Sequence, residues 1–125
     1  MLAAARLQTL VLTSDIERAR TFYTQVLGLP LSGESLGALV YDVGGGDLRV
    51  SPVPSTQPSE HTVLGFAVEN LDAVVTEMAS RAVQPERFAH FEHDAHGVCT
   101  APDGTRVIWF RDPDGNLLSV VQYAC

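Results

Sequence analysis

The chain has 125 residues, of which 46% are hydrophobic and 18% charged, so it can bury the core of one domain and is not expected to be disordered. Its net charge is −7, from 15 acidic and 8 basic side chains, and no basic cluster suggests a nucleic acid partner. Cys99 and Cys125 indicate no disulfide framework. No apolar run has the length of a signal or membrane segment, so we expect a cytoplasmic protein without an anchor.

The first half of the chain alternates strand and helix signals. Ser14 and Glu17 have capping-box spacing, which predicts the start of a helix, and Gly28 is typical of a helix end. Apolar residues between them recur at helical spacing. The predicted elements are a strand at 6–13, this helix, strands at 31–37 and 38–43, a glycine turn at 44–46 and a strand at 48–53.

The second half repeats this pattern after a segment rich in Pro and Ser, residues 54–60, which is predicted to be a surface linker. Residues 13–16 correspond to residues 68–71, and Asn70 is a plausible N-cap. The predicted elements are a strand at 61–68, a helix at 71–82, a strand at 88–93, a turn at 102–104 that residues 98–100 lead into, and a closing hairpin.

The closing hairpin has the clearest local signals. Residues 107–110 (VIWF) and 117–121 (LLSVV) are apolar and rich in β-branched or aromatic side chains. Between them, Pro113 sets φ for a turn, and Gly115 and Asn116 tolerate left-handed backbone.

Each half therefore has a strand, a helix and about three further strands. The sequence predicts an α+β fold in which two βαβββ modules, at about 6–53 and 61–123, form a single domain. Each module is expected to have a mostly antiparallel sheet with one helix packed on it.

Three segments carry a resemblance to a known family: residues 14–23 (SDIERARTFY), 26–29 (VLGL) and 110–116 (FRDPDGN). With the paired modules, the chain resembles the vicinal oxygen chelate superfamily, also called the glyoxalase/bleomycin resistance protein/dioxygenase superfamily. The resemblance implies two cupped sheets around a cleft, and a homodimer. It is specific for fold and weak for function, because this superfamily hosts many chemistries.

The resemblance also implies where a divalent metal would bind. The family's usual ligands are His or Gln on the first strand of each module and Glu on the last. Those four places hold Gln8, Arg49 or Ser51, Val63 and Ser119 in this sequence. Valine cannot bind a metal and arginine would repel one. We therefore expect no metal cofactor; the alternative is a divalent metal held by displaced ligands.

The same alignment predicts the lining of the cleft. Trp109, the only tryptophan, either lines it or packs in the core, and these alternatives stay open. Pockets for organic ligands are mainly apolar with a few polar groups, and the predicted lining has that composition. The predicted substrate-binding residues are Gln8, Leu10, Arg49, Ser51, Val63, Gly65, Trp109, Arg111, Leu117 and Ser119.

Histidines supply the weak catalytic candidates. His61 lies close in sequence to Val63, and His96 stands beside Gly97; either could act as a general acid or base. His90, His93 and His96 are spaced by three, which would suit a metal site on a helix. Because this segment is predicted as strand and loop, partly exposed polar histidines are the favoured interpretation.

The first functional hypothesis is a metal-independent binding protein that sequesters a mostly apolar or aromatic organic ligand, similar to the drug-sequestering, antibiotic-resistance branch of the family. The alternative is an enzyme of the family, a lyase, isomerase, cyclase or dioxygenase, metal-free or with displaced metal ligands; a glyoxalase-like lyase or isomerase is the form expected. An accessory domain without a ligand is a third reading. The ligand, and whether a pocket spans a dimer, stay open at this point.

Overall fold

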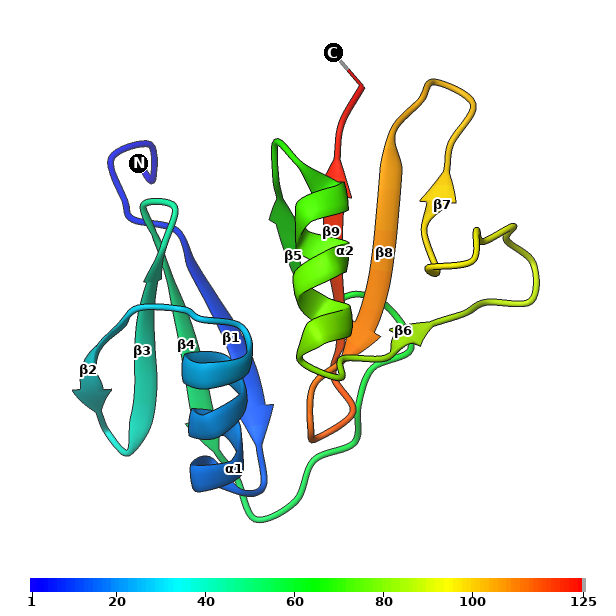
Figure 1. Ribbon diagram of the computed structural model, residues 1–125. Coiled ribbons are helices and arrows are strands. Elements are labelled where there is room, and N and C mark those ends of the chain that lie inside the picture. The colour runs from blue at the N-terminus through cyan, green and yellow to red at the C-terminus, as the bar shows by residue number, and fades with distance from the viewer. Residues whose placement is uncertain (125) are drawn as a thin grey trace. The chain divides into compact units, whose positions relative to one another are not determined.

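The computed structural model describes residues 1–124 and divides into two compact units (Figure 1). Unit 1 consists of Met1–Pro58 together with Pro113–Gly115. Unit 2 consists of Ser59–Asp112 and the chain from Asn116 onward. The boundary thus falls within the Pro- and Ser-rich segment, and the tip of the last hairpin belongs to unit 1.

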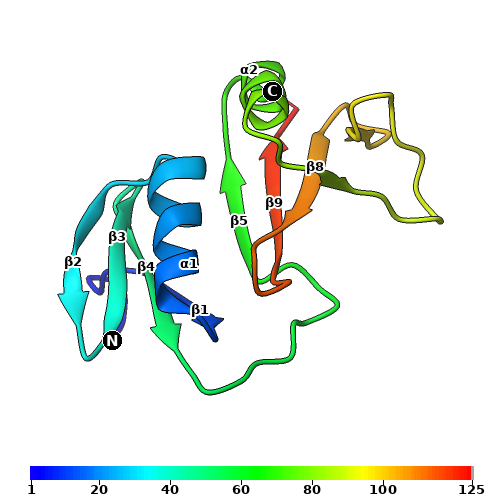
Figure 2. The ribbon, with the colours of Figure 1, turned by 60° about the horizontal axis from the view of Figure 1, so that its bottom comes forward.

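Unit 1 is a four-stranded sheet with one helix, ordered β1-β4-β3-β2. The β1–β4 pair is parallel, and the other two pairs are antiparallel. Figure 2 shows α1 running along one face of this sheet. The elements are β1 Gln8–Thr13, α1 Ile16–Arg20 with its π-helical continuation η1 Thr21–Val26, β2 Leu31–Ser35, β3 Ala38–Val43 and β4 Gly46–Pro52.

The core of unit 1 lies between the helix and one face of the sheet. Alternate strand residues are buried, as the period of a strand requires. Tyr23 of the helix and Tyr41 of β3 are both fully buried, with ring centroids 6.1 Å apart. The remaining buried apolar residues of this unit are Val11, Ala19, Ala38, Leu39, Leu48 and Val50.

The start of α1 differs from the prediction. Asp15, rather than Ser14, is the N-cap, and its side chain accepts the backbone N–H of Arg18 at 3.1 Å. Ser14 instead donates its N–H and its hydroxyl to Asp114 Oδ1, both at 2.8 Å. The predicted capping box is therefore wrong, because a residue distant in sequence binds the serine.

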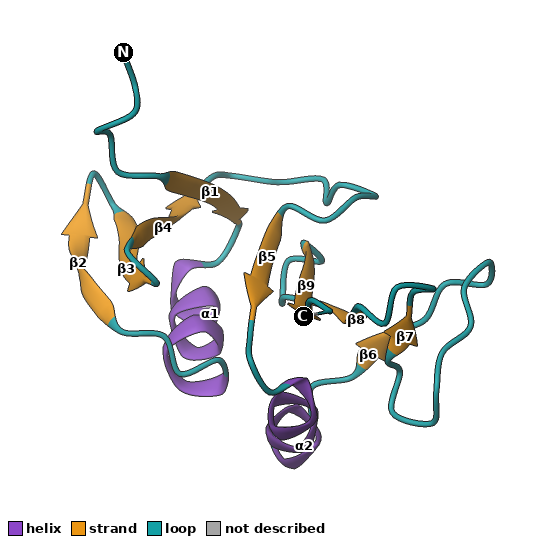
Figure 3. Cartoon of the chain, turned by 90° about the horizontal axis from the view of Figure 1, so that it is seen from above, coloured by secondary structure: helices purple, strands orange, loops and turns teal. Residues whose placement is uncertain are grey.

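Unit 2 is a sheet ordered β5-β9-β8-β6, with β7 also paired to β8. The β5–β9 pair is parallel and the others are antiparallel. In Figure 3, α2 lies on one side of the strands of this unit. The elements are β5 Leu64–Ala67, α2 Leu71–Ser80, β6 Pro85–Glu86, β7 Cys99–Thr100, β8 Arg106–Arg111 and β9 Leu117–Gln122.

The predicted N-cap and closing hairpin of unit 2 are confirmed. Asn70 accepts the N–H of Ala73 at 3.1 Å. β8 and β9 pair antiparallel, and the Asp112 side chain accepts the backbone N–H and the Nδ2 of Asn116 at 2.9 and 2.8 Å. The core of this unit lies on the α2 side and comprises Leu64, Leu71, Met78, Val98, Ile108, Phe110, Leu118 and Val120; Leu117, on the opposite face by strand alternation, is also buried.

The strand predicted at 88–93 is wrong, because these residues form part of a loop between β6 and β7. The loop supplies its own backbone partners. The Phe88 N–H donates to His93 Nε2 at 3.0 Å, and the Asp94 N–H donates to the carbonyl of Val98 at 2.9 Å. Since these polar groups bond within the loop, the segment needs no neighbouring strand.

No helix in residues 1–124 is long and apolar enough to cross a membrane. Cys99 is a free, half-buried thiol, and Cys125 lies outside the described residues.

The turn between β2 and β3 contains a leucine in left-handed backbone. Leu36 has φ of +51° and Gly37 of +79°, and the Leu36 side chain is 96% exposed. Left-handed backbone costs a residue other than glycine about 1–2 kcal/mol, and asparagine adopts it more readily. Leu36→Asn should therefore raise the free energy of unfolding in urea by about 1 kcal/mol.

Gly37→Ala is the matched control and should lower the same free energy by about 1 kcal/mol. An added Cβ would lie 3.7 Å from Pro52 Cγ, an ordinary contact, so the loss comes from the backbone. A destabilised Leu36→Asn variant would contradict the assignment of strain to Leu36.

Candidate ligand-binding face

Most of the predicted site residues of unit 2 lie on the sheet face opposite α2. The register pairs Gly65 with Ser119 and Ser119 with Trp109, so these three residues form a row across β5, β9 and β8. Their sequence neighbours Ile108 and Val120 point to the other face and are buried in the core. A Cβ added to Gly65 would lie 3.0 Å from Ser119 Oγ, a tight contact, so the missing side chain gives the serine hydroxyl its room.

A second row lies toward the last hairpin. Leu117 pairs with Arg111, and the Val63 N–H donates to the Leu117 carbonyl at 3.0 Å. Arg111 Nε donates to Glu86 Oε1 at 3.2 Å, and both side chains are partly exposed. The structure thus brings six predicted residues onto or beside one face; that a ligand binds there stays a prediction.

Trp109 is half-buried in an aromatic cluster formed with Phe88, Phe91 and His93. The Phe91 ring stacks on Trp109 with centroids 5.6 Å apart and planes 20° apart. Phe88 meets the indole edge-on at 5.2 Å, and His93 at 6.1 Å. These partners of Trp109 were not predicted, because residues 88–93 were assigned to a strand. The aromatic and histidine content of residues 88–93 is the sequence signal that could have indicated them.

His93 holds the loop in this arrangement through both ring nitrogens. Its Nε2 accepts the Phe88 N–H, so the proton of the neutral ring lies on Nδ1, which donates to the Gly97 carbonyl at 2.9 Å. The two hydrogen bonds of His93 therefore hold both ends of the loop that covers Trp109.

His93→Ala should remove both hydrogen bonds and loosen the aromatic cluster. We expect a loss of about 1–3 kcal/mol in the free energy of unfolding, because a part-buried N–H and a part-buried carbonyl lose their partner. Trp109 fluorescence should also become more accessible to quenching by acrylamide. His90→Ala is the control, since His90 contributes ring contacts to Phe88 and Phe91 but lies outside this fastening. Equal quenching in both variants would contradict the role given to His93.

The four predicted residues of unit 1 lie together on that unit's sheet. Leu10 pairs with Arg49 across β1 and β4, and Gln8 and Ser51 occupy positions of the same parity. Leu10 is 56% exposed, and the Arg49 guanidinium donates to the Ser35 carbonyl at 2.6 Å. Arg49 and Ser51 share a face, so both stay candidates for the family's glutamate position.

Neither predicted catalytic histidine lies on the Trp109 row. His61 is exposed, precedes β5, and its Nδ1 is 2.8 Å from Ser59 Oγ. His96 lies in the turn before β7 and lines a pocket of about 330 Å³ on the α2 side of the sheet. The structure therefore does not bring His61 or His96 to the face that carries Trp109.

The side chains present do not fit the metal centre that the resemblance implies. Val63 offers no donor atom, Ser119 offers a neutral hydroxyl, and Arg49 carries a positive charge. In the part of the chain that the structure describes, no three His, Cys, Asp or Glu side chains are grouped so that they could hold a metal ion.

Two carboxylates are strongly engaged by backbone donors outside this face. Burial disfavours the charge of Asp94, but the N–H groups of Val98 and His96, each 2.9 Å from Oδ1, outweigh it and lower the pKa of Asp94. Asp114 likewise has a lowered pKa, because hydrogen bonds from Ser14 and Thr13 outweigh its burial. Both groups stabilise loops rather than a reactive centre.

Sequence comparison assigns the family. The sequence profile of the Glyoxalase/Bleomycin resistance protein/Dioxygenase superfamily matches residues 6–120. The chain belongs to this superfamily. The recognition made from residues 14–29 and 110–116 is thereby confirmed, as is the α+β fold class. No curated protein matches the chain significantly.

Solved structures of this superfamily share the fold. A putative glyoxalase family protein from Bacillus anthracis has a TM-score of 0.75 at 17% identity, with 94% of this chain and 93% of that chain covered. A superfamily member from Sphaerobacter thermophilus DSM 20745 has a TM-score of 0.74 at 19% identity, covering 98% and 100%. A lactoylglutathione lyase from Agrobacterium tumefaciens has a TM-score of 0.69 at 20% identity, covering 95% and 93%. At these identities the likeness establishes the fold alone.

Proposed function

We propose that the protein is a metal-independent binding protein that holds a flat, mostly apolar or aromatic organic molecule against Trp109. The observation that carries this proposal is the row formed by Gly65, Ser119 and Trp109 on one sheet face. It combines a large aromatic surface with a small hydroxyl and a glycine that has no side chain to cover them. Small-molecule sites usually have this mixture of apolar surface and a few polar groups.

The contact between Phe91 and Trp109 supports a flat ligand. Phe91 stacks almost parallel to the indole, yet its own side chain is 46% exposed. A planar ring therefore already occupies one side of Trp109 in the offset geometry that aromatic pairs favour. A planar ligand can extend this stack, with the Ser119 hydroxyl beside it as a hydrogen-bonding group.

The residues at the family's metal-ligand positions support binding without a metal. Val63 and Ser119 need no cation to offset their desolvation, whereas a carboxylate buried in the same place would. This proposal also includes a homodimer and a cytoplasmic location, both of which rest on the family and on composition. Light scattering after gel filtration measures the oligomeric state; a monomer at working concentration would overturn the dimer.

Titration of the intrinsic fluorescence of Trp109 tests the proposed binding face. Because Trp109 is the only tryptophan, the signal comes from one place. Fused aromatic compounds should shift its emission, and their saturated counterparts should not. Gly65→Leu should crowd the Ser119 hydroxyl, cover the row and weaken an aromatic hit at least several-fold, given about 0.5–1.5 kcal/mol for a stacked pair in addition to buried area.

Gly33→Leu is the matched control, because Gly33 lies on a strand of unit 1 and a Cβ there would meet nothing within 4 Å. It should leave the affinity unchanged. If saturated compounds bind as well as aromatic ones, or if both leucine variants behave alike, the Trp109 face is not the binding site.

A further inference from the structure

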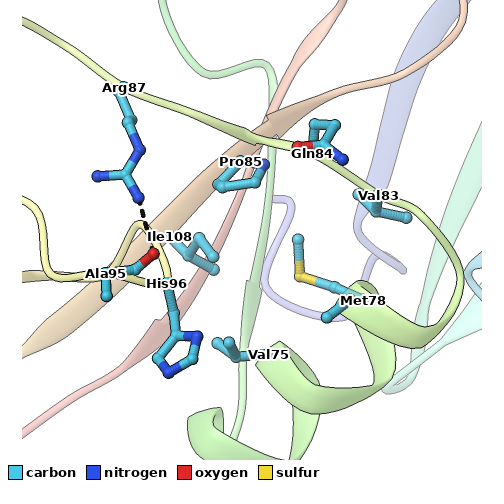
Figure 4. Close-up of a pocket in the computed structure, with 10 residues that line it drawn as sticks. Val75, Met78, Val83, Gln84, Pro85, Arg87, Ala95, His96 and Ile108 are labelled. Carbon is cyan, nitrogen blue, oxygen red and sulfur yellow. Dashed lines mark hydrogen bonds between the residues drawn. The ribbon is translucent and has the colours of Figure 1, made fainter.

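We propose that unit 2 has a second binding site, for small amphipathic carboxylates, on the opposite side of its sheet from Trp109. A pocket of about 330 Å³ opens there between the second half of α2, the chain at residues 83–87 and the turn at residues 95–96. This volume lies at the lower end of the roughly 300–1,000 Å³ of small-molecule sites. Figure 4 shows the lining side chains around it: Val75, Met78, Ala79, Val83, Gln84, Pro85, Arg87, Ala95, His96 and Ile108.

The floor of this pocket is apolar. Ile108 is 1% exposed and Met78 7% exposed, and both belong to the core of unit 2. Val75, Val83 and Pro85 are half-buried around them. Because Ile108 and Trp109 are consecutive on β8, they face opposite sides of the sheet, and the pocket is separate from the face of the proposed function.

The charge of the lining is opposite to that of the whole protein. The chain carries 15 acidic side chains, yet the lining includes Arg87 and His96 and no carboxylate. Within residues 1–124 Arg87 forms no ion pair, whereas six of the other arginines do. Its guanidinium instead donates to the carbonyls of Asp94 and Ala95, each at 3.0 Å, as Figure 4 shows for Ala95.

Three carboxylates adjoin lining residues in sequence, and each is already engaged: Glu77 pairs with Arg81, Glu86 with Arg111, and Asp94 accepts backbone N–H groups. Asp94 Oδ1 accepts the N–H groups of His96 and Val98, so it is used to shape the turn that forms one wall of the pocket. The Arg87 guanidinium also stabilises this turn, because it donates to the carbonyls of Asp94 and Ala95. A guanidinium has five N–H donors in a planar fork, and two of them serve the carbonyls here. The remaining donors and the permanent charge suit a carboxylate ligand.

An anionic head group with an aliphatic tail is therefore the class of ligand that matches both parts of the pocket. The tail would remove the half-buried surface of Val75, Val83 and Pro85 from water, and the head group would pair with Arg87. A cation of the same length would meet the positive charge of Arg87. An alcohol of the same length would bury its tail but gain no charge-assisted hydrogen bond.

Octanoate is the probe for this site, and Met78 is the reporter. The chain has two methionines, Met1 and Met78, so protein labelled at the methionine methyl groups gives at most two methyl signals, with Met1 as the internal reference. Octanoate should shift the Met78 signal in a saturable manner. Octylamine and octanol, at the same concentrations, should shift it far less. No saturable shift with octanoate, or equal shifts with octylamine, would overturn the proposal.

Two charge variants on α2 sharpen the test. Ala79 lines the pocket and Ser80 does not, and both are exposed in the last turn of α2. Ala79→Glu should weaken octanoate binding at least about tenfold, because a like charge then faces the head group. Ser80→Glu adds the same charge to the same turn and should change the affinity by less than about twofold.

Equal effects of these two variants would show that the response is general electrostatics, and would overturn the assignment to the pocket. Gly65→Leu, which tests the Trp109 face, should leave octanoate binding unchanged. A loss of octanoate binding in Gly65→Leu would contradict the separation of the two sites, while loss of aromatic binding alone would not affect this proposal.

Discussion

Asp114→Ala should lower the free energy of unfolding by about 2–4 kcal/mol, as expected when a buried carboxylate with several donors is removed. The Asp114 side chain is 2% exposed. It accepts hydrogen bonds from Thr13 Oγ1 at 2.5 Å and from the N–H and hydroxyl of Ser14, both at 2.8 Å, and it pairs with Arg18 at 3.2 Å. Removal of the carboxylate takes away the acceptor of the Ser14 N–H and hydroxyl at the start of α1. Urea unfolding at neutral pH measures the loss.

The Asp114 carboxylate should also make the free energy of unfolding depend on pH in the acid range. Because the pKa of Asp114 is lower in the folded protein than in the unfolded chain, its contribution is fully present above the unfolded value of about 3.9 and is lost as the pH falls through the folded pKa. Asp114→Asn should therefore flatten the part of the acid dependence below about pH 4. A variant with wild-type stability at pH 7 and an unchanged acid profile would contradict the role assigned to Asp114.

Gly97→Ala should be the most damaging glycine substitution tested, with a loss of about 3 kcal/mol that combines left-handed strain with overpacking. Gly97 is buried with φ of +96°, and a Cβ there would lie 2.6 Å from Pro85 Cβ and 2.8 Å from Pro85 Cγ. The substitution would push apart the turn at residues 94–97 and the chain at Pro85. It should therefore also disturb the two hydrogen bonds of His93 and the wall of the pocket that Arg87 and His96 line.

Gly104→Ala separates the cost of left-handed backbone from the cost of overpacking. Gly104 has nearly the same φ, +93°, but a Cβ there would lie 3.8 Å from Ala124 Cβ, an ordinary contact. It should cost only the backbone strain, about 1–2 kcal/mol. The difference between the two variants, measured by urea unfolding, gives the cost of the contact with Pro85. Equal losses would show that Pro85 moves aside freely.

The sheets and the candidate face could be predicted because local signals determine them. Alternation along residues 107–111 and 117–121, with a turn of known chemistry between them, leaves one register, and that register places Trp109 beside Ser119. The repeat between residues 13–16 and 68–71 then relates the first strand and the helix of each unit. Within each unit, the signals that predict its elements come from residues near one another in sequence.

The features that sequence analysis missed depend on partners distant in sequence or on side chains that replace secondary structure. Ser14 has the spacing of a capping box, but Asp114 binds it and leaves the cap to Asp15. Phe88 and Phe91 have strand propensity, but their loop closes on the two nitrogens of His93. The pocket that Arg87 and His96 line lies where α2, residues 83–87 and this loop meet, so no single segment of the sequence indicates it.

Elemental analysis of protein purified without chelator tests most directly whether the protein acts without a metal. We expect no stoichiometric Ni, Zn, Mn or Fe in the wild-type protein and no difference in Gln8→Ala, because Val63 and Ser119 stand in two of the family's ligand positions. The measurement should be made on the same preparation that shows a Trp109 fluorescence response to an aromatic compound. About one equivalent of metal, lost in Gln8→Ala, would contradict the account, since a four-ligand site of the usual composition needs that residue.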